Sequence, residues 1–368
     1  MGSAKLTFHE SLGGAGVSPA RPRCMIWESL KLPMGRIPFL LVLDECRIEK
    51  IMDKHNNAVM MCSRRLRPGK MISAIQKWGS FVRFSHTVFA LPFALAAMMV
   101  AARVHHGWPG WRTFLLILAA MVSARTCAMA FNRIVDRRFD ALNPRTKNRH
   151  LPAGQISLAG AILLCVVSAA GLVIASYFLN SICFYLSPVA LIVICFYSLT
   201  KRFTDYTHVF LGIALALAPI GAWLAVKGMD VSAAEVVQMT VLALAVILWL
   251  VGFDIIYALQ DHDFDKAHGL HSLVVAWGQS NALAAAFLAH MLMCGLLLAF
   301  GFLCGFRIAY LIGWFIIVGC LSLEHWIARR RSLNWINLAF FRLNALVSAV
   351  FFVVVAAEVV FPTPFLMR

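Results

Sequence analysis

Long apolar runs fill this chain from about residue 80 onward, and each is close to the length of a membrane-spanning helix. A helix needs about 20 apolar residues to cross a bilayer, and nine segments of that kind can be distinguished. They lie near residues 82–103, 112–133, 157–179, 181–200, 207–226, 233–257, 281–304, 307–328 and 338–361. Eight or ten spans would also fit the length, but the loop charges favour nine. We therefore predict an all-α polytopic protein with nine transmembrane helices in the lipid bilayer.

Basic residues divide unevenly between the two sets of loops that nine spans create. Lysine and arginine concentrate in cytoplasmic loops of membrane proteins. The loops after the second, fourth, sixth and eighth spans hold twelve of them, whereas the opposite loops hold four: Arg103, Arg112, Lys227 and Arg307. These loops, and the basic N-terminus, are therefore predicted to be cytoplasmic.

The composition excludes two broad classes of protein. Residues are 61% hydrophobic and 14% charged, a balance that soluble domains do not carry. The formal charge of +16 would suit a nucleic-acid partner, but in a membrane protein it more often reflects cytoplasmic loops, so we predict no nucleic-acid binding. The ten cysteines are scattered and include no C-x-x-C pair, which favours small apolar fillers over disulfides or zinc ligands.

The first part of the chain differs from the rest. Residues 1–75 are mixed, basic and weakly periodic, and their longest apolar stretch, residues 37–43, is too short to span a bilayer. We predict that residues 1–75 form a poorly ordered cytoplasmic extension and that residues 76–368 form the transmembrane domain.

Two acidic clusters, residues 132–140 and 254–265, lie where long apolar runs end, and they hold six of the chain's 17 acidic residues. In each cluster two aspartates four residues apart would share one face of a helix: Asp136 with Asp140, and Asp261 with Asp265. Such carboxylates repel each other unless a cation bridges them, and Mg²⁺ completes its coordination with phosphate oxygens. We predict that the four aspartates bind Mg²⁺ and, through it, a diphosphate.

Basic side chains on the same predicted side would add direct contacts to that diphosphate: Arg145, Arg149, Lys201 and Arg202. Cations there would stabilise the charge on a departing diphosphate. Arg83, at the start of the first span, is a candidate anchor for a carboxylate on a small substrate. A single charge at the end of a span is usually only solvated, but two D-x-x-x-D patterns on one side favour function.

These segments resemble the UbiA superfamily of intramembrane aromatic prenyltransferases over roughly residues 75–361. The family's first motif, N-D-x-x-D-x-x-x-D, corresponds to Asn132, Arg133, Asp136 and Asp140, with arginine at a position where many members have aspartate. Its second motif, D-x-x-x-D after a tyrosine, corresponds to Tyr257, Asp261 and Asp265. Residues 143–154 resemble the family's loop after the first motif, and residues 197–204 its tyrosine-and-lysine segment. Residues 84–94 and 257–265 are similar to the branch that includes 4-hydroxybenzoate polyprenyltransferases.

The resemblance implies nine helices around a central cavity that opens laterally to lipid. It also implies Mg²⁺-dependent transfer of a prenyl group from a polyprenyl diphosphate to an aromatic acid, on the cytoplasmic side of a bacterial inner membrane. We expect Asn132 to assist the four metal-binding aspartates, Arg145, Arg149 and Lys201 to bind the diphosphate, and Arg83 to hold the acceptor. Tyr197 and Tyr257 are expected to stabilise the allylic cation or to order the metal shell.

Three alternatives remain open at this point. The acceptor could be 4-hydroxybenzoate, as in ubiquinone synthesis, or a dihydroxynaphthoate, as in menaquinone synthesis. Haem or a chlorophyll precursor would be another acceptor class. A different kind of protein, an ion-coupled transporter, also places aspartates in membranes, but here they gather at one face and no inverted repeat is evident.

Overall fold

The computed structural model describes residues 77–82, 87–329 and 339–361. These residues form helices and turns, and no strand occurs among them. The predicted extension at residues 1–75 lies outside the described residues, and so does Arg83.

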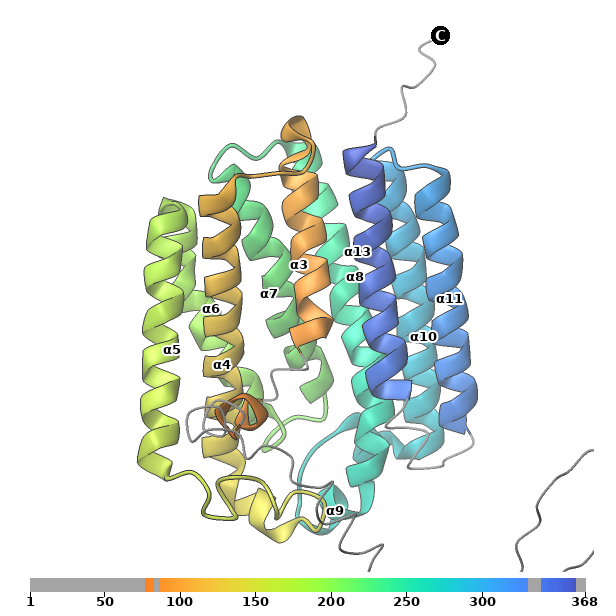
Figure 1. Ribbon diagram of the computed structural model, residues 1–368. Coiled ribbons are helices and arrows are strands. Elements are labelled where there is room, and N and C mark those ends of the chain that lie inside the picture. Colours follow the sequence, from red (N-terminus) through yellow and green to blue (C-terminus); the bar gives the residue numbers. More distant parts are fainter. Residues whose placement is uncertain (1–76, 83–86, 330–338, 362–368) are drawn as a thin grey trace, which may run out of the picture. The chain divides into compact units, whose positions relative to one another are not determined.

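Nine helices of 15 to 32 residues run up and down through the described part of the chain (Figure 1). Eight segments are long and apolar enough to cross a membrane, and the first helix is a shorter apolar one. The nine helices follow the predicted spans in order, which confirms the all-helical membrane fold. They are α3 (Thr87–Ala101), α4 (Trp111–Leu142), α5 (Leu158–Leu179), α6 (Ser181–Thr200), α7 (Thr207–Lys227), α8 (Ala233–Ala258), α10 (Leu273–Leu303), α11 (Ile308–Arg329) and α13 (Asn344–Val360).

Helix α4 is longer than the second predicted span, which was expected to end near residue 133. Its sequence contains no glycine or proline, and the first helix-breaking residue is Pro144. A residue before proline is forced out of the helical region, and Asn143 accordingly has φ −78° and ψ 120°. At 1.5 Å per residue α4 measures about 48 Å, against about 30 Å for the hydrocarbon core. Its last turns, which carry Asp136 and Asp140, therefore extend beyond the hydrocarbon.

Helix α10 also begins earlier than predicted, at Leu273 instead of near residue 281. The side chain of Ser272 accepts a hydrogen bond from the backbone N–H of Val275 and so caps the first turn. Gly278 then interrupts the helix with φ 76° and ψ 161°, a conformation that side-chain-bearing residues rarely adopt. The membrane-spanning part of α10 follows this break.

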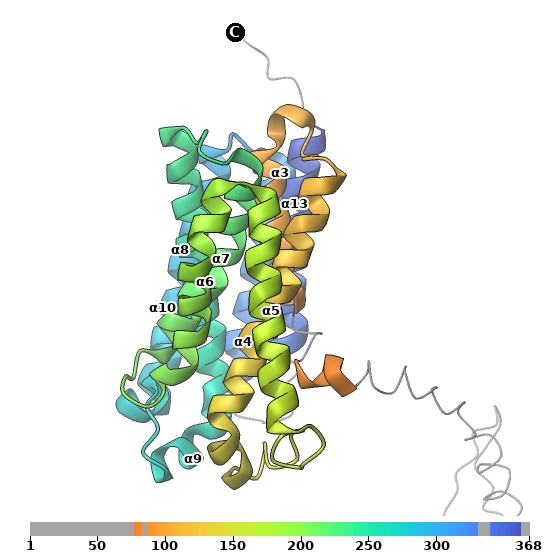
Figure 2. The same cartoon turned by 90° about the vertical axis from the view of Figure 1, so that its left-hand side faces the viewer.

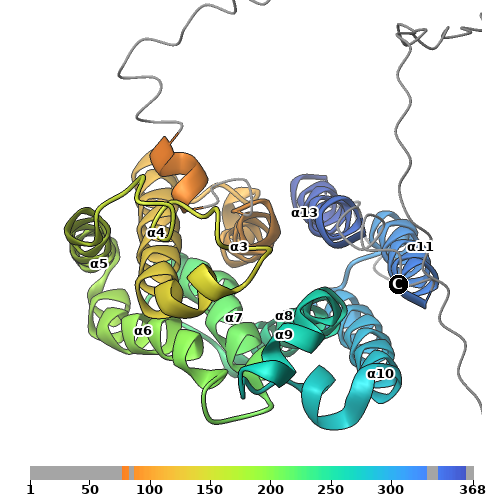
Figure 3. The same cartoon turned by 90° about the horizontal axis from the view of Figure 1, so that it is seen from below.

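The main apolar core lies among α3, α7, α8, α10, α11 and α13, with Trp223 and Trp249 fully buried in it. Helix α7 packs against α3, α6 and α8, while α4 packs against α5 and α6 on the other side of the bundle (Figures 2 and 3). The backbones of α7 and α8 approach closely, since a Cβ on Gly212 would lie 2.9 Å from the carbonyl oxygen of Ile247. Small residues at such contacts allow the van der Waals packing that holds helices together in lipid.

The connections differ in length at the two ends of the bundle. At one end Asn180 alone joins α5 to α6, residues 228–232 join α7 to α8, residues 304–307 join α10 to α11, and residues 102–110 join α3 to α4. The Asn180 side chain accepts from the N–H of Cys183 at 3.0 Å and donates to the carbonyl of Leu224 at 2.9 Å, so it caps α6 and ties it to α7. The other end carries the long connections, residues 143–157 and 259–272 (Figure 1). Because neighbouring helices are antiparallel, both acidic clusters lie at this second end.

Candidate active site

The first acidic cluster lies on the last turns of α4. Asn132 donates to Asp136 at 2.9 Å, one helical turn away. Asp140 is buried and pairs with Arg149 at 2.5 Å, while the buried Arg133 lies 3.7 Å from its second oxygen, Oδ2. The arginine that departs from the family motif therefore neutralises an aspartate of that same motif.

The second cluster does not lie on one continuous α-helix, although its spacing suggested one. Helix α8 ends at Ala258, a 3₁₀ turn follows over Leu259–Asp261, and the short helix α9 spans His262–Ala267. Asp261 closes the 3₁₀ turn and Asp265 lies on α9, and both are buried. The change of helix type alters the directions in which the two carboxylates point, yet both stay at the end of the bundle that holds Asp136 and Asp140.

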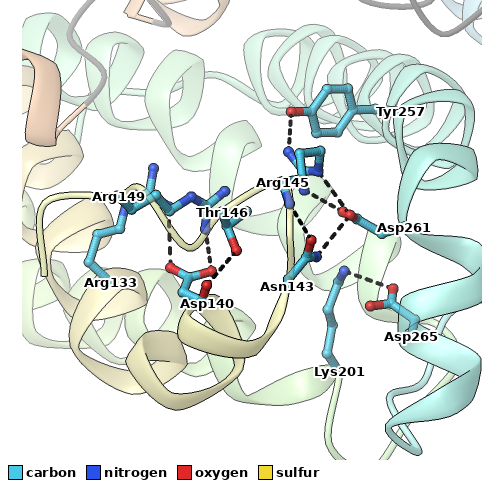
Figure 4. Close-up of polar contacts among 10 residues, drawn as sticks. All are labelled: Arg133, Asp140, Asn143, Arg145, Thr146, Arg149, Lys201, Tyr257, Asp261 and Asp265. Carbon is cyan, nitrogen blue, oxygen red and sulfur yellow. Dashed lines mark hydrogen bonds and ion pairs between the residues drawn. The ribbon is translucent and has the colours of Figure 1, made fainter. Parts of the chain in front are cut away.

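The loop after α4 connects the two clusters, as Figure 4 shows. Arg145 donates to both oxygens of Asp261, from Nε at 2.9 Å and from Nη2 at 2.5 Å, and its Nη1 donates to the hydroxyl of Tyr257 at 3.0 Å. Its guanidinium also lies over the Tyr257 ring, 5.5 Å from the centroid. Arg149, on the same loop, pairs with Asp140. One loop thus supplies one arginine to each acidic cluster.

Two polar side chains that the sequence analysis did not assign fix this loop. Asn143 donates to Asp261 at 3.2 Å, and its own Oδ1 accepts from the backbone N–H of Arg145 at 2.9 Å, which forms a turn typical of asparagine. Thr146 donates to the backbone carbonyl of Asp140 at 3.0 Å (Figure 4). Both side chains are buried. The Asn-Pro pair that ends α4 was the available signal for Asn143.

The turn after α6 brings two more basic residues to the site. Lys201 lies 3.3 Å from Asp265, and Arg202 lies 3.6 Å from Asp136. Burial alone would lower the pKa of Lys201, but the carboxylates around it, Asp265 first, outweigh this, and its pKa lies above the ordinary value. Burial likewise disfavours the charge on Arg145, but its bonds with Asp261 and Tyr257 raise the pKa of Arg145. Both side chains are therefore cations at neutral pH.

The structure thus brings together nearly all of the predicted site residues that it describes: Asn132, Asp136, Asp140, Arg145, Arg149, Lys201, Tyr257, Asp261 and Asp265. Tyr197 lies one turn before Lys201, packed against Ala128 and Leu172, and no hydrogen bond joins it to these carboxylates in the described part of the chain. The predicted acceptor anchor, Arg83, lies outside the described residues.

A further carboxylate, Asp254, lies two turns before Asp261 on α8. It accepts a 2.6 Å hydrogen bond from Nδ1 of His208, a fully buried residue of α7. The sequence analysis missed this partner because a lone histidine in an apolar span carries no motif. The pair joins α7 to α8, and the Asp254 carboxylate is among those that raise the pKa of Lys201.

The carboxylates suit a magnesium ion that is shared with phosphate. Enzymes usually hold Mg²⁺ through one or two carboxylates and substrate phosphates instead of an all-protein cage. Within the described residues no three acidic, histidine or cysteine side chains form such a cage. Asp140 Oδ2 is buried and accepts no hydrogen bond, and its charged neighbour is Arg133 at 3.7 Å. The donor set therefore fits Mg²⁺ that is bound together with a diphosphate.

Comparison with known proteins gives consistent matches over most of the chain. The sequence model of the UbiA prenyltransferase family matches residues 90–346. The chain is 33% identical over 266 residues to a 4-hydroxybenzoate octaprenyltransferase of Burkholderia ambifaria, which covers 72% of this chain and 88% of that protein. It is 29% identical over 264 residues to a protein of the same name from Paraburkholderia phytofirmans, with the same two coverages.

Solved structures with the same fold include an apo UbiA homologue from Aeropyrum pernix K1. That protein is 30% identical, and the match has a TM-score of 0.67 over 74% of this chain and 98% of the other. A UbiA homologue from Archaeoglobus fulgidus bound to GPP and Mg²⁺ is 21% identical, with a TM-score of 0.57 over 76% of this chain and 99% of the other. At that identity the likeness concerns the fold alone.

Proposed function

Because the chain belongs to the UbiA prenyltransferase family, we propose that it transfers a polyprenyl group from a polyprenyl diphosphate to 4-hydroxybenzoate, with Mg²⁺, in quinone biosynthesis. The chain is an integral membrane enzyme of the prenyltransferase class. One observation carries the proposal beyond the family: two acidic clusters from distant segments are joined by a loop that supplies an arginine to each (Figure 4).

In the proposed mechanism three basic residues leave their aspartate partners and bind the diphosphate instead. Arg145, Arg149 and Lys201 now pair with Asp261, Asp140 and Asp265 respectively. When the diphosphate binds, these three side chains turn their N–H groups to phosphate oxygens, which guanidinium and ammonium groups bind well. The carboxylates that they leave would hold Mg²⁺. The exchange keeps every charge compensated, so neither set of side chains is left unpaired in a partly buried site.

The reaction itself then needs charge stabilisation and orientation. Bound Mg²⁺ supplies positive charge that stabilises the departing diphosphate. The allylic carbon–oxygen bond ionises, the ring carbon beside the phenolic hydroxyl attacks the allylic carbon, and loss of the ring proton restores the aromatic ring. Tyr257, held by Arg145, presents its ring near the second cluster and is a candidate to stabilise the allylic cation. The same role is proposed for Tyr197, and Arg83 is proposed to anchor the acceptor's carboxylate.

We place the enzyme in a bacterial inner membrane with its site on the cytoplasmic side. The curated relatives named above come from bacteria. The end of the bundle that holds the acidic clusters also carries Arg145, Lys147, Arg149 and Lys201 on its loops, as the positive-inside rule requires of a cytoplasmic face.

The direct test measures prenyl transfer by the purified protein with radiolabelled polyprenyl diphosphate and Mg²⁺. Separate reactions contain 4-hydroxybenzoate or 1,4-dihydroxy-2-naphthoate. We expect labelled product and released diphosphate with 4-hydroxybenzoate, and loss of both in Asp136→Ala. Asp263→Ala is the matched control, because the Asp263 side chain is fully exposed on the second cluster. Product from the naphthoate alone would refute the acceptor assignment, and full activity of Asp136→Ala would refute the role of the carboxylates.

A further inference from the structure

A cleft lies on the face of α4 that points away from Asp136 and Asp140. It has a volume of about 720 Å³ and lies between the end of α4, the end of α6 and the turn after α9. Five residues of α4 line the cleft in two rows with four-residue spacing: residues 134, 138 and 142, and residues 135 and 139. This spacing puts them on a face away from Asp136 and Asp140. We call this space the basic cleft, because its polar side chains are Arg137, Arg138, Arg202 and His268.

The basic cleft carries more positive charge than its neighbours compensate. Arg202 is the side chain that also reaches Asp136, at 3.6 Å, and it lies over the Phe139 ring, 5.8 Å from the centroid. Arg137 donates to the backbone carbonyl of Ile134, which brings no charge. Arg138 is exposed and makes no ion pair with any described residue. Three guanidinium groups thus face one carboxylate, and an anion would complete the charge balance.

The other half of the cleft is apolar and continues along α6. Leu199 lines the cleft, and the same face of α6 presents Phe196, Ile192, Val189 and Tyr185 at alternating spacings of three and four residues. Each of these four side chains is at least 40% exposed. They form an apolar stripe, the α6 stripe, that leads from the membrane interior to the basic cleft. A free phosphate ion would use only the basic half of this surface.

The cleft also lies at the depth of lipid headgroups. Helix α6 ends at Thr200, so Leu199 belongs to its last turn and Arg202 lies just beyond its end. The last turns of α4 extend beyond the hydrocarbon. Basic pockets at this level on the cytoplasmic side suit the headgroups of anionic lipids. We propose that the basic cleft binds the phosphate headgroup of an anionic phospholipid, with one acyl chain of that lipid along the α6 stripe.

The test compares retention of phosphatidylglycerol and phosphatidylcholine by the purified protein. The protein is reconstituted in nanodiscs of equal parts of the two lipids, partly delipidated, and examined by native mass spectrometry. Each basic residue near anionic headgroups strengthens attraction about fivefold, so Arg138→Glu should weaken phosphatidylglycerol retention at least about tenfold. Arg329→Glu is the matched control, because Arg329 is an exposed base at the same end of the bundle, on α11. His268→Glu is a second cleft variant, and circular dichroism confirms that each variant is folded.

The proposal predicts preferred retention of phosphatidylglycerol by the wild type, loss of that preference in both cleft variants, and its persistence in Arg329→Glu. Millimolar inorganic phosphate should not displace the lipid. Equal retention of the two lipids by the wild type would overturn the proposal, as would equal loss in Arg138→Glu and Arg329→Glu. Displacement by inorganic phosphate would also overturn it, because the site would then recognise phosphate without the acyl chain.

Discussion

Replacing Asp261 by asparagine removes one charge from the second acidic cluster while keeping the shape of the side chain. The carboxylate now receives two N–H groups from Arg145, at 2.9 and 2.5 Å, and one from Asn143 at 3.2 Å. The asparagine amide keeps one acceptor oxygen, but its NH2 group cannot accept the second N–H group of Arg145. One hydrogen bond to a charged group is therefore lost, which costs about 1.5–3 kcal/mol. The Arg145 side chain is 30% exposed, and screening by water reduces this to about 1 kcal/mol. The variant should therefore fold.

The effect on catalysis should be much larger than the effect on stability. Removing one group that stabilises developing charge in an active site typically lowers the rate by about 10² to 10³. We expect a decrease of that size in kcat/KM for the polyprenyl diphosphate, measured from initial rates at saturating 4-hydroxybenzoate and Mg²⁺. Asp263→Asn makes the same chemical change on an exposed neighbour and should keep full activity.

A double-mutant cycle with Arg145→Gln tests whether Asp261 and its partner Arg145 act as a unit in the reaction. If they do, the two effects are coupled, and the double variant loses less activity than the product of the single losses. Independent effects would indicate that Arg145, on the loop after α4, does not act in the same step as Asp261. If kcat/KM of Asp261→Asn lay within threefold of Asp263→Asn, the reasoning about the second cluster would be wrong.

Three further changes have defined outcomes. Addition of EDTA should abolish transfer, and Mg²⁺ should restore it. Lys201→Ala should raise KM for the polyprenyl diphosphate about tenfold through loss of one charged contact, whereas Lys201→Arg should stay close to wild type. Because the raised pKa of Lys201 keeps it protonated, the wild-type KM should stay constant from about pH 7 to 9. A rise of KM toward pH 9 would contradict that charge state. In Gly252→Ala the new Cβ would overlap the buried ring of His290, so the melting temperature should fall by an amount equivalent to about 1–3 kcal/mol, whereas Gly295→Ala, with open space around it, should be neutral.

The order of the helices could be predicted because it depends on local sequence alone. Each span is a continuous apolar run, and the loop charges give its direction. The length of α4 was underestimated because hydropathy falls at Arg133, whereas the helix persists until Pro144 breaks it. A membrane span and a helix are different quantities: the predicted span ends near residue 133, whereas the helix that carries Asp136 and Asp140 continues to Leu142.

The pairing of side chains within the site could not be predicted in the same way. Spacing along the chain puts Asp136 above Asp140, but it says nothing about which arginine crosses to Asp261, more than a hundred residues away. That choice depends on the turn that Asn143 forms at the end of α4 and on the 3₁₀ turn after α8. Both are local departures from regular helix, and they determine the pairing through tertiary contacts that sequence periodicity does not encode.

The single-residue link at Asn180 and the short turns at residues 228–232 and 304–307 tie neighbouring helices closely at the end of the bundle away from the site. Helices tied closely at one end separate most at the other. If the helices spread by a small angle at the site end, the proposed prenylated product would leave sideways without loss of packing near the short turns. We expect product release, and not only chemistry, to become slower if the site end of the bundle is cross-linked.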